Sequence, residues 1–483
     1  MSNSSEPNLT GPAEDLGFST ISELKADFTQ KNISPTELVA ELTHRIAEID
    51  DCIDGLNSVL AINNHLDEQI KSTNLNQPLG GIPILIKDNI ESVGLPATAG
   101  SLALVGRQIH ADAPLVSQLK SAGALILGST NLSEWANIRS GNSTSGWSAV
   151  GGLTANPWKY SHSAGGSSSG SGAAVAAGLV PVAIGTETDG SIVCPAALNG
   201  IVGIKPTVGR VSTKGIIPIS FSQDSPGPLA RNVADATEVL GVLINDNNLK
   251  TNLTADTELT VGVVRKWLTG SDETNAIFEN QLSALAKSGI KVVEIDLPDI
   301  ADEVGADEFM VLLHELVHTM DAYLSSRPGD GVKSLADVLE FNTRNNELEL
   351  SHFGQEYFEI AATSGGLNQK YHETRKRNLD WAKNVILDPA LAKVDVLVGI
   401  PYGPAWRSDL VNGDDFASAS WMTCPAAISG YPIASIPMGF VSDLPVGMGV
   451  IARANDEAKL VTALAKFEKV FDLADLIPTF NRN

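Results

Sequence analysis

Cysteine and long apolar runs are both scarce in this sequence. Three cysteines occur in 483 residues, namely Cys52, Cys194 and Cys424, and no two of them have CxxC spacing. They therefore offer neither a disulfide framework nor a zinc knuckle. No apolar run approaches the ~20 residues that a transmembrane helix requires, so we expect no membrane partner.

Positive charge is scarce as well. The chain has 33 Lys and Arg against 57 Asp and Glu, which gives a formal net charge of −24. Nucleic-acid binding needs clustered Lys and Arg, and the sequence contains no such cluster, so we expect no nucleic-acid partner. The first residues contain neither the basic segment nor the apolar core of a secretory signal, and we therefore expect a cytoplasmic location.

The remaining composition is that of a large globular protein, with 43% hydrophobic and 19% charged residues. At ~150 residues per domain the length permits up to three domains, but no internal repeat or long linker divides the chain. Residues 1–18 are polar and contain several Pro and Gly residues. We therefore predict a loose N-terminal arm over 1–18 and a single large domain over 19–483.

Short apolar runs alternate with helical patterns along this domain. Capping signals at Thr20–Glu23 and Ser34–Glu37 predict the starts of two helices. Strands are predicted at 82–86, 124–128, 180–184, 259–264, 290–295, 394–400 and 433–437, and helices at 114–122, 173–177, 275–288 and through most of 300–390. This alternation predicts an α/β fold with a central mixed β-sheet covered by helices on both faces.

Three segments combine residue types that could carry chemistry. Lys87 ends the first apolar run, where burial would favour a neutral amine that can act as a base, although most strand-end lysines are solvated. Residues 165–172, GGSSSGSG, have the composition of a flexible linker but lead into a helix. They also contain G-x-S-x-G centred on Ser168, after a segment (158–162) that is a poor strand. Residues 185–192, GTETDGSI, form either a plain turn or an oxyanion hole of converging N–H groups.

Together these segments resemble the amidase signature family of serine hydrolases. The stretch from Gly165 to Thr207, GGSSSGSGAAVAAGLVPVAIGTETDGSIVCPAALNGIVGIKPT, is similar to the hallmark of that family. GGIPILIKDNI, STNLSEW, SFSQDSPGPLARNVADA and ASIPMG extend the likeness over nearly the whole chain. SLAL, NLSEWAN, SGWSA, GIIPISFSQD, SLADVLEFN and HFGQE look most similar to bacterial peptide amidases. The resemblance implies the amidase signature fold, with a catalytic core over about 80–236 and substrate-pocket helices over about 300–420.

The resemblance also implies a Ser–Ser–Lys triad. Ser191 would be the nucleophile, Ser167 the bridging serine after a cis peptide bond, and Lys87 the general base. The carbonyl of Gly141 would help to hold the substrate. The oxyanion hole would be formed by the amides of Thr188, Asp189, Gly190 and Ser191. Such a triad hydrolyses amides through an acyl-enzyme, and we expect no metal or other cofactor.

Two positions depart from many relatives, which have Gly where this chain has Asp189 and Arg where it has Val193. A carboxylate beside an oxyanion hole opposes the developing negative charge. We therefore expect the side chain of Asp189 to turn away, so that only its amide takes part.

A rival motif lies further along the chain. The segment His314–His318, HELVH, matches the HExxH motif of zinc proteases, and Glu340 could be a third ligand. Five-residue patterns recur by chance. We instead predict that this helix covers the active-site cleft and shapes the substrate pocket.

We therefore predict an amidohydrolase that cleaves a carboxamide C–N bond, at the C-terminal amide of a peptide, and releases ammonia. The alternatives are a broader aliphatic amidase or aryl acylamidase, the amidase subunit of a glutamine-dependent tRNA amidotransferase, an HExxH zinc peptidase, or a non-catalytic binding protein. The expected partner is a small-molecule or peptide amide, and the expected state is a monomer or homodimer.

Overall fold

The computed structural model describes residues 16–300, 303–474 and 476–480. Its centre is an 11-stranded sheet in the order β1-β3-β2-β8-β10-β9-β14-β15-β13-β11-β12. The strands are β1 (Val59–Ile62), β2 (Pro83–Lys87), β3 (Leu125–Thr130), β8 (Val182–Glu187), β9 (Val202–Lys205), β10 (Ser225–Ala230), β11 (Thr260–Val263), β12 (Lys291–Glu294), β13 (Val396–Gly399), β14 (Ile433–Val441) and β15 (Leu444–Ile451). Two small hairpins join β4 (Trp147–Ser148) to β5 (Gly152–Leu153) and β6 (Ala155–Asn156) to β7 (Lys159–Ser163).

The sheet is mixed, as predicted. Strand β2 runs parallel to β3 and β8, and β11 runs parallel to β12 and β13, while the other neighbours in the large sheet are antiparallel. Strand β14 pairs with β9, so the early and late parts of the chain share one sheet. Strands β2, β3, β8, β9, β10, β13 and β15 are buried along their whole length, which explains why several of them are continuous apolar runs in the sequence. The predicted single large α/β domain is confirmed.

Helices cover this sheet and continue beyond it. They are α1 (Ile21–Gln30), α2 (Pro35–Arg45), α3 (Leu66–Ser72), α4 (Pro114–Ser121), α5 (Ser169–Ala176), α6 (Val193–Asn199), α7 (Val233–Leu243), α8 (Asp272–Lys287), α9 (Glu303–Ser326), α10 (Leu335–Arg344), α11 (Asn346–Glu349), α12 (Glu356–Thr363), α13 (Gln369–Asp380), α14 (Asp388–Leu391), α15 (Thr423–Ser429) and α16 (Glu457–Phe471). Short 3-10 helices span Leu16–Phe18, Leu102–Leu104, Glu134–Asn137, Leu249–Thr254 and Arg265–Trp267, and π-helical turns span Ile46–Asp50 and Trp381–Leu387.

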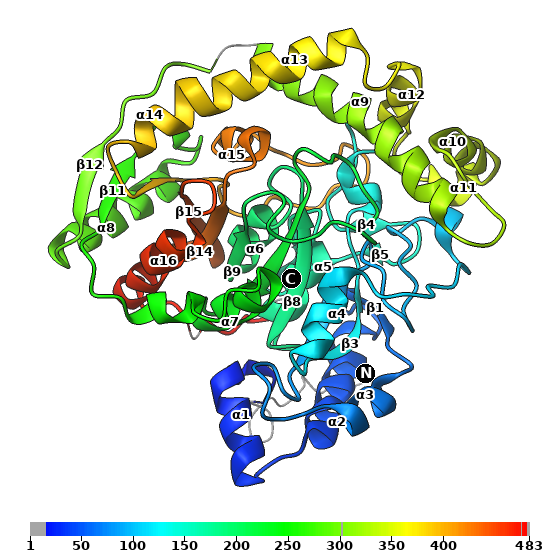
Figure 1. Ribbon diagram of the computed structural model, residues 1–483, viewed down its shortest axis with the longest axis horizontal. Helices are drawn as coiled ribbons and strands as arrows, with labels where there is room; N and C mark the ends of the chain where they lie inside the picture. Colours follow the sequence, from blue (N-terminus) through cyan, green and yellow to red (C-terminus); the bar gives the residue numbers. More distant parts are fainter. Residues whose placement is uncertain (1–15, 301–302, 475, 481–483) are drawn as a thin grey trace, which may run out of the picture.

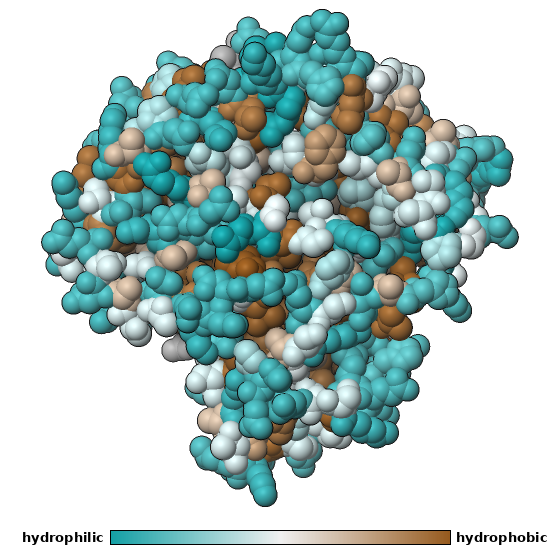
Figure 2. Space-filling view, viewed as in Figure 1, coloured by the Kyte–Doolittle hydropathy of each residue, from teal (hydrophilic) through white to brown (hydrophobic). Residues whose placement is uncertain are grey.

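The helices form layers that can be followed in Figure 1. On the sheet, α4 contacts α7, α7 contacts α16, and α16 contacts α8. Helix α5 packs on α6. Helices α9 and α13 lie side by side in an arc above α15. A separate apolar core holds α9, α10 and α12 together and includes Leu316, Val338 and Phe358. The surface in Figure 2 is mainly hydrophilic, with apolar residues in a recess near the centre and in smaller patches along the upper part.

The capping box predicted at Thr20 is present, and the predicted helix start at Ser34 has a capping box as well. Thr20 and Ser34 each accept a hydrogen bond from the backbone N–H of the glutamate three residues on, and the side chain of that glutamate accepts one from the backbone N–H of the cap. Pro35 occupies the first turn of α2. Within the described residues no helix is both long and apolar enough to cross a bilayer.

Three local expectations need correction. Residues 1–15 of the predicted arm lie outside the described residues, but Leu16–Phe18 form a 3-10 helix whose Phe18 ring lies under the guanidinium groups of Arg45 and Arg231. The segment judged a poor strand, 158–162, overlaps most of β7, which pairs with β6 despite its polar sequence. Helix α5 begins at Ser169 and not at the predicted residue 173. The end of the Gly/Ser stretch is therefore helical, and its small side chains are buried.

Candidate active site

The structure brings Lys87 and Ser167 together. Lys87 Nζ lies 2.7 Å from Ser167 Oγ, 3.0 Å from Thr186 Oγ1 and 3.2 Å from the carbonyl oxygen of Thr186. Both Lys87 and Ser167 are fully buried. The predicted base and bridging serine therefore make direct contact through side chains 80 residues apart.

Parallel pairing of β2 and β8 produces this contact. Ile86 pairs with Ile184, so the two strands end at the same edge of the sheet, with Lys87 on one and Thr186 on the other. Carboxyl ends of adjacent parallel strands are where α/β proteins gather their polar groups. Asn89 follows β2 and donates a hydrogen bond of 3.0 Å to Thr186 Oγ1, which thus accepts from two side chains.

Burial strongly affects the protonation of Lys87. It lowers the pKa of this amine to about 7, against the opposing influence of the carboxylates of Asp224 and Glu187. Taking an ammonium out of water disfavours its charged form. Near neutral pH a large fraction of Lys87 is therefore an uncharged amine, which has a lone pair.

Ser167 and Ser168 connect this lysine to the next loop. The Gly166–Ser167 peptide bond is cis, as the family resemblance implies. Ser168 Oγ donates to the Thr186 carbonyl and accepts from the Thr186 amide, while the Ser168 amide donates to the carbonyl of Ser191 at 3.2 Å. Ser168, the centre of the G-x-S-x-G pattern, is thus fully buried and holds two loops together.

The turn after β8 presents four free amides. The backbone N–H groups of Thr188, Asp189, Gly190 and Ser191 donate no hydrogen bond to any described residue. Gly190 has a φ of +77°, and the hydroxyl of Tyr402 occupies the space that a Cβ would need there. The Ser191 hydroxyl likewise has no hydrogen-bond partner among the described residues and is near the surface, since Ser191 is 9% exposed. Among those residues, the hydroxyls of Ser191 and Ser167 do not form a direct hydrogen bond with each other.

Two buried carboxylates fix the shape of this turn. Glu187 Oε2 accepts from the amides of Ile192 and Val193 at 2.7 and 2.9 Å. Asp224 accepts from the Thr188 hydroxyl at 2.6 Å and from the amides of Ile219 and Ser220. These contacts make Asp224 a structural hydrogen-bond acceptor.

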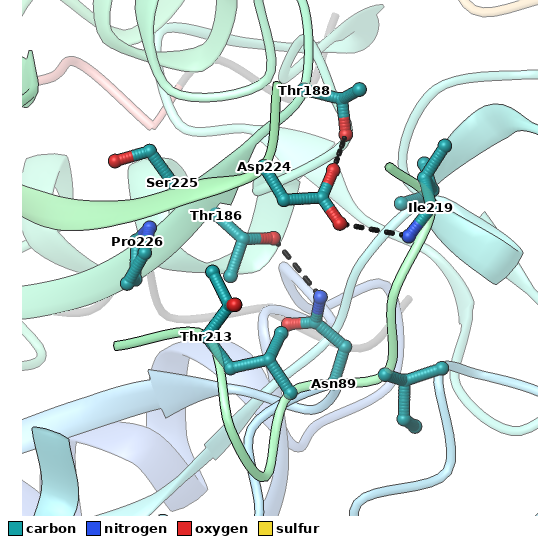
Figure 3. Close-up of a pocket in the computed structure, with 11 residues that line it drawn as sticks. Asn89, Thr186, Thr188, Thr213, Ile219, Asp224, Ser225 and Pro226 are labelled. Carbon is teal, nitrogen blue, oxygen red and sulfur yellow. Dashed lines mark hydrogen bonds between the residues drawn. The ribbon is translucent and has the colours of Figure 1, made fainter. Parts of the chain in front are cut away.

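Figure 3 shows a small cavity beside this turn. Asn89 and Thr186 lie on one side of it, and the hydrogen-bonded pair Thr188–Asp224 lies on the other. It has room for about one water molecule. Neither Lys87 nor Ser191 lines it, although Thr186 and Thr188 of the candidate site do.

Gly141 lies in an exposed loop whose position α12 fixes. Its amide donates to Glu356 Oε1 at 2.7 Å, and the same oxygen accepts from Ser140 Oγ at 2.8 Å. Asp414 accepts from both the amide and the hydroxyl of Ser145 in the same loop. Two distant segments thus hold the predicted substrate loop.

Two side chains of the HExxH motif, His314 and Glu315, form hydrogen bonds with other parts of the protein. Glu315 accepts from Tyr371 Oη at 2.7 Å and from Ser220 Oγ at 2.5 Å, and His314 Nδ1 lies 2.5 Å from the carbonyl of Gly366. No group of three His, Cys, Asp or Glu side chains that could hold a metal occurs in the part of the chain that the structure describes. Helix α9 instead supports the loop at 219–224.

Sequence reasoning missed several residues of this site. Thr186, Asn89 and Glu187 carry no motif signal of their own, because their importance comes from which strands are neighbours. Lys205 is buried beside Glu187, and its amine donates to the carbonyl of Tyr431 at 2.8 Å. A lysine that ends an apolar strand, as at Lys87, was the available signal for Lys205.

The chain belongs to the Amidase family, whose sequence model matches residues 37–461. It is an amide-hydrolysing enzyme with the amidase signature fold. Among solved structures it is similar to native peptide amidase from Stenotrophomonas maltophilia, with a TM-score of 0.87 and 38% identity over 94% of this chain and 97% of that one. A structure of the peptide amidase PAM with the competitive inhibitor chymostatin matches equally well, with TM-score 0.87 and 38% identity over 93% and 97%.

Sequence relatives include proteins named for other functions. A probable amidase of Arabidopsis thaliana is 32% identical over 93% of this chain and 89% of its own length. A glutamyl-tRNA(Gln) amidotransferase subunit from Prochlorococcus marinus is 31% identical over 94% and 98%. Family membership therefore establishes that the enzyme acts on an amide C–N bond. It does not identify the substrate, which has to be inferred from the site.

Proposed function

We propose that this enzyme removes the C-terminal carboxamide of peptides through a Ser191–Ser167–Lys87 triad. The observation that carries the proposal is the set of hydrogen bonds around Lys87. A neutral amine has two N–H donors and one lone pair. Thr186 offers two acceptors, its carbonyl and its hydroxyl, and the third neighbour is Ser167 Oγ at 2.7 Å. The lone pair is thus available for the proton of Ser167.

The proton then moves along two hydroxyl groups. Ser191 attacks the amide carbon as its proton passes to Ser167, while Ser167 gives its own to Lys87. The resulting ammonium of Lys87 returns a proton through Ser167 to the leaving nitrogen, and ammonia departs. Water repeats the sequence on the acyl-enzyme and releases the peptide acid.

Four unpaired amides suit the tetrahedral oxyanion. The N–H groups from Thr188 to Ser191 are adjacent to the nucleophile and donate to no described residue. Preorganised donors of this kind each contribute about 3–4 kcal/mol to transition-state stabilisation. The Gly141 loop is the proposed contact for the substrate backbone.

The substrate class is proposed from the relatives. Peptide amidase is among the similar solved structures at 38% identity, whereas the tRNA amidotransferase relative from Prochlorococcus marinus is at 31%. Ammonia release should be measured with a peptide amide, an aryl amide and free glutamine. We expect the peptide amide to give the highest kcat/KM, and the highest kcat/KM with glutamine or the aryl amide would contradict the proposal.

Variants test the triad in the same assay. Ser191→Ala and Lys87→Ala should each lower kcat by at least about 10³-fold. Ser167→Ala should lower it by about 10²-fold or more. Ser222→Ala is a matched control, because this serine lies in the neighbouring loop and takes no part in the relay. Full activity of Ser191→Ala would overturn the assignment of the nucleophile.

A further inference from the structure

The glutamate of the HExxH segment, Glu315 on α9, is fully buried and accepts three hydrogen bonds. Tyr371 Oη on α13 donates to its Oε1 at 2.7 Å. Ser220 Oγ and the backbone amide of Ser222 donate to its Oε2 at 2.5 and 3.2 Å. One carboxylate oxygen of Glu315 is thus bonded to helix α13 and the other to the loop at 219–224.

The hydroxyl group of Ser220 depends on Glu315 for its acceptor. Ser220 is fully buried, and its Oγ accepts from the backbone amides of Ser222 and Gln223 at 3.2 and 3.1 Å. A serine hydroxyl has two lone pairs and one proton, so these two bonds leave the proton to be donated. Glu315 Oε2 receives it at 2.5 Å. Without the carboxylate this buried hydroxyl would lose its acceptor, which would destabilise the present shape of the loop.

The same loop holds the turn after β8. Asp224 Oδ2 accepts from the backbone amides of Ile219 and Ser220 at 2.9 and 3.0 Å. Asp224 Oδ1 accepts from the Thr188 hydroxyl at 2.6 Å, as Figure 3 shows. Three hydrogen bonds in a row therefore connect Glu315 to Thr188. All four residues on this path are buried, so solvent has little access to its hydrogen bonds.

This path ends at the candidate oxyanion hole. The backbone amide of Thr188 is the first of the four amides in the turn that donate to no described residue. Because the Thr188 side chain is bonded to Asp224, the direction of its N–H follows the position of the loop at 219–224. Oxyanion donors act only when they are held in place beforehand, and a misplacement of about 1 Å can cost about 100-fold in rate.

We propose that Glu315 is a positioning residue, which acts through the loop at 219–224 to hold the Thr188 amide in the oxyanion hole. The inference rests on the proposed function, because the oxyanion hole belongs to that mechanism. Glu315 itself takes no part in proton transfer. Since the Thr188 amide is proposed to bind the charge that develops on the substrate oxygen, loss of its position should lower kcat more than it raises KM.

Two substitutions of Glu315 test this role with a peptide amide as substrate. In Glu315→Gln the amide oxygen can accept from Ser220 and Ser222 while its NH2 group donates to Tyr371 Oη, so kcat should stay within about threefold of wild type. Glu315→Ala removes all three contacts and should lower kcat about tenfold, with KM changed by less than about threefold. Wild-type kcat in Glu315→Ala, or equal losses in the two variants, would overturn the inference.

A double-mutant cycle tests the path between the two residues. Thr188→Val removes the hydroxyl that Asp224 holds but keeps the backbone amide, and it should lower kcat about fivefold. If both residues act through one path, the double variant with Glu315→Ala should lose about tenfold, as Glu315→Ala does alone. A loss of about fiftyfold, the product of the single effects, would mean independent action and overturn the inference. Ser220→Ala takes the place of Glu315→Ala in the cycle if the latter does not fold.

Inhibitors distinguish a misplaced oxyanion hole from weaker substrate binding. A peptide aldehyde adds to the nucleophilic serine and gives a tetrahedral adduct whose oxygen occupies the hole, whereas the peptide acid forms no such adduct. In Glu315→Ala the Ki of the aldehyde should rise about tenfold and that of the acid should change by less than about twofold. An equal change in the two Ki values would overturn the inference.

Two control variants separate positioning from loss of stability. Glu303→Ala makes the same change at an exposed position of α9 and should have wild-type kinetics. Val338→Ala opens a cavity in the apolar core around α10 and should lower Tm but keep kcat within about threefold. If Val338→Ala lost as much kcat as Glu315→Ala, the effect would be one of stability and the inference would fail. Failure of the proposed function would be seen separately, as activity retained by Ser191→Ala.

Discussion

The environment of Lys87 favours its neutral form, which is the form that a general base requires. It is fully buried, its polar neighbours are Ser167 and Thr186, and no carboxylate lies within ion-pair distance of it among the described residues. A carboxylate in direct contact would hold the ammonium form and remove the lone pair. The carboxylates of Asp224 and Glu187 act only from a distance.

This environment predicts the pH dependence on the acid side. The active form of Lys87 is neutral, and burial lowers its pKa to about 7. Protonation below that value removes the base, so kcat/KM should fall about tenfold for each pH unit well below 7 and level off above it. The measurement is kcat/KM for a peptide amide from pH 5 to 8. A flat profile over this range would contradict the role of Lys87, and the exposed Lys214→Ala should keep the wild-type profile.

Some residues of the candidate site could be identified from the sequence and others could not. Lys87, Ser167 and the turn at 188–191 could be identified because each has a local pattern that also resembles a known family. Thr186 could not be identified, because it contacts Lys87 from the neighbouring strand. Glu308 could not be identified either, because it lies on a helix more than 100 residues further along the chain and contacts the site region through Gln223. Their roles depend on tertiary contacts that no local pattern encodes.

Helix α9 illustrates the scale of elements. Its Glu308 and Glu315 lie about two turns apart and both bind the segment 219–224, through Gln223 and through Ser220 and Ser222. That segment in turn holds Thr188 through Asp224. The helix thus supports the loop beside the candidate site. That it covers the active-site cleft stays a prediction.

A chelator distinguishes these two interpretations of α9. Since Glu315 is engaged with Tyr371 and Ser220, we predict that EDTA leaves ammonia release unchanged and that added zinc does not increase it. His318→Ala, which loses a ring contact with Phe221, should keep kcat within about threefold. Loss of activity with EDTA and its recovery with zinc would favour the HExxH alternative.

Element boundaries were predictable to different degrees. The capping boxes of α1 and α2 are local hydrogen-bond patterns and fall where the sequence indicates. Helix α5 and strand β7 were misjudged, because burial of small side chains and pairing with β6 outweigh their weak local preferences.

At the scale of the whole molecule, one sheet joins the early and late parts of the chain. Strand β14 lies beside β9 although more than 200 residues separate them, so the order of strands depends on distant pairings. The alternation of apolar runs predicted a mixed sheet, but such runs carry no information on which strand is next to which. The net charge of −24 is likewise a property of the whole molecule.

That charge predicts a preference among substrates. A negative field attracts cations over a Debye length of ~10 Å at 0.1 M salt. Peptide amides with lysine or arginine should therefore have higher kcat/KM than matched peptides with glutamate, and the ratio should shrink as salt rises from about 0.02 to about 0.5 M. The neutral analogue serves as the control. A ratio that does not change with salt would show that local pocket contacts, rather than the overall field, set the preference.

The identity of the nucleophile is tested most directly by covalent labelling. The enzyme should be treated with a serine-reactive fluorophosphonate and digested, and the modified peptide sequenced by mass spectrometry. We predict a single adduct on Ser191, no adduct in Ser191→Ala, and labelling at least about tenfold slower in Lys87→Ala because the base is missing. An adduct on Ser167 or Ser168, or undiminished labelling of Ser191→Ala, would contradict the proposed mechanism.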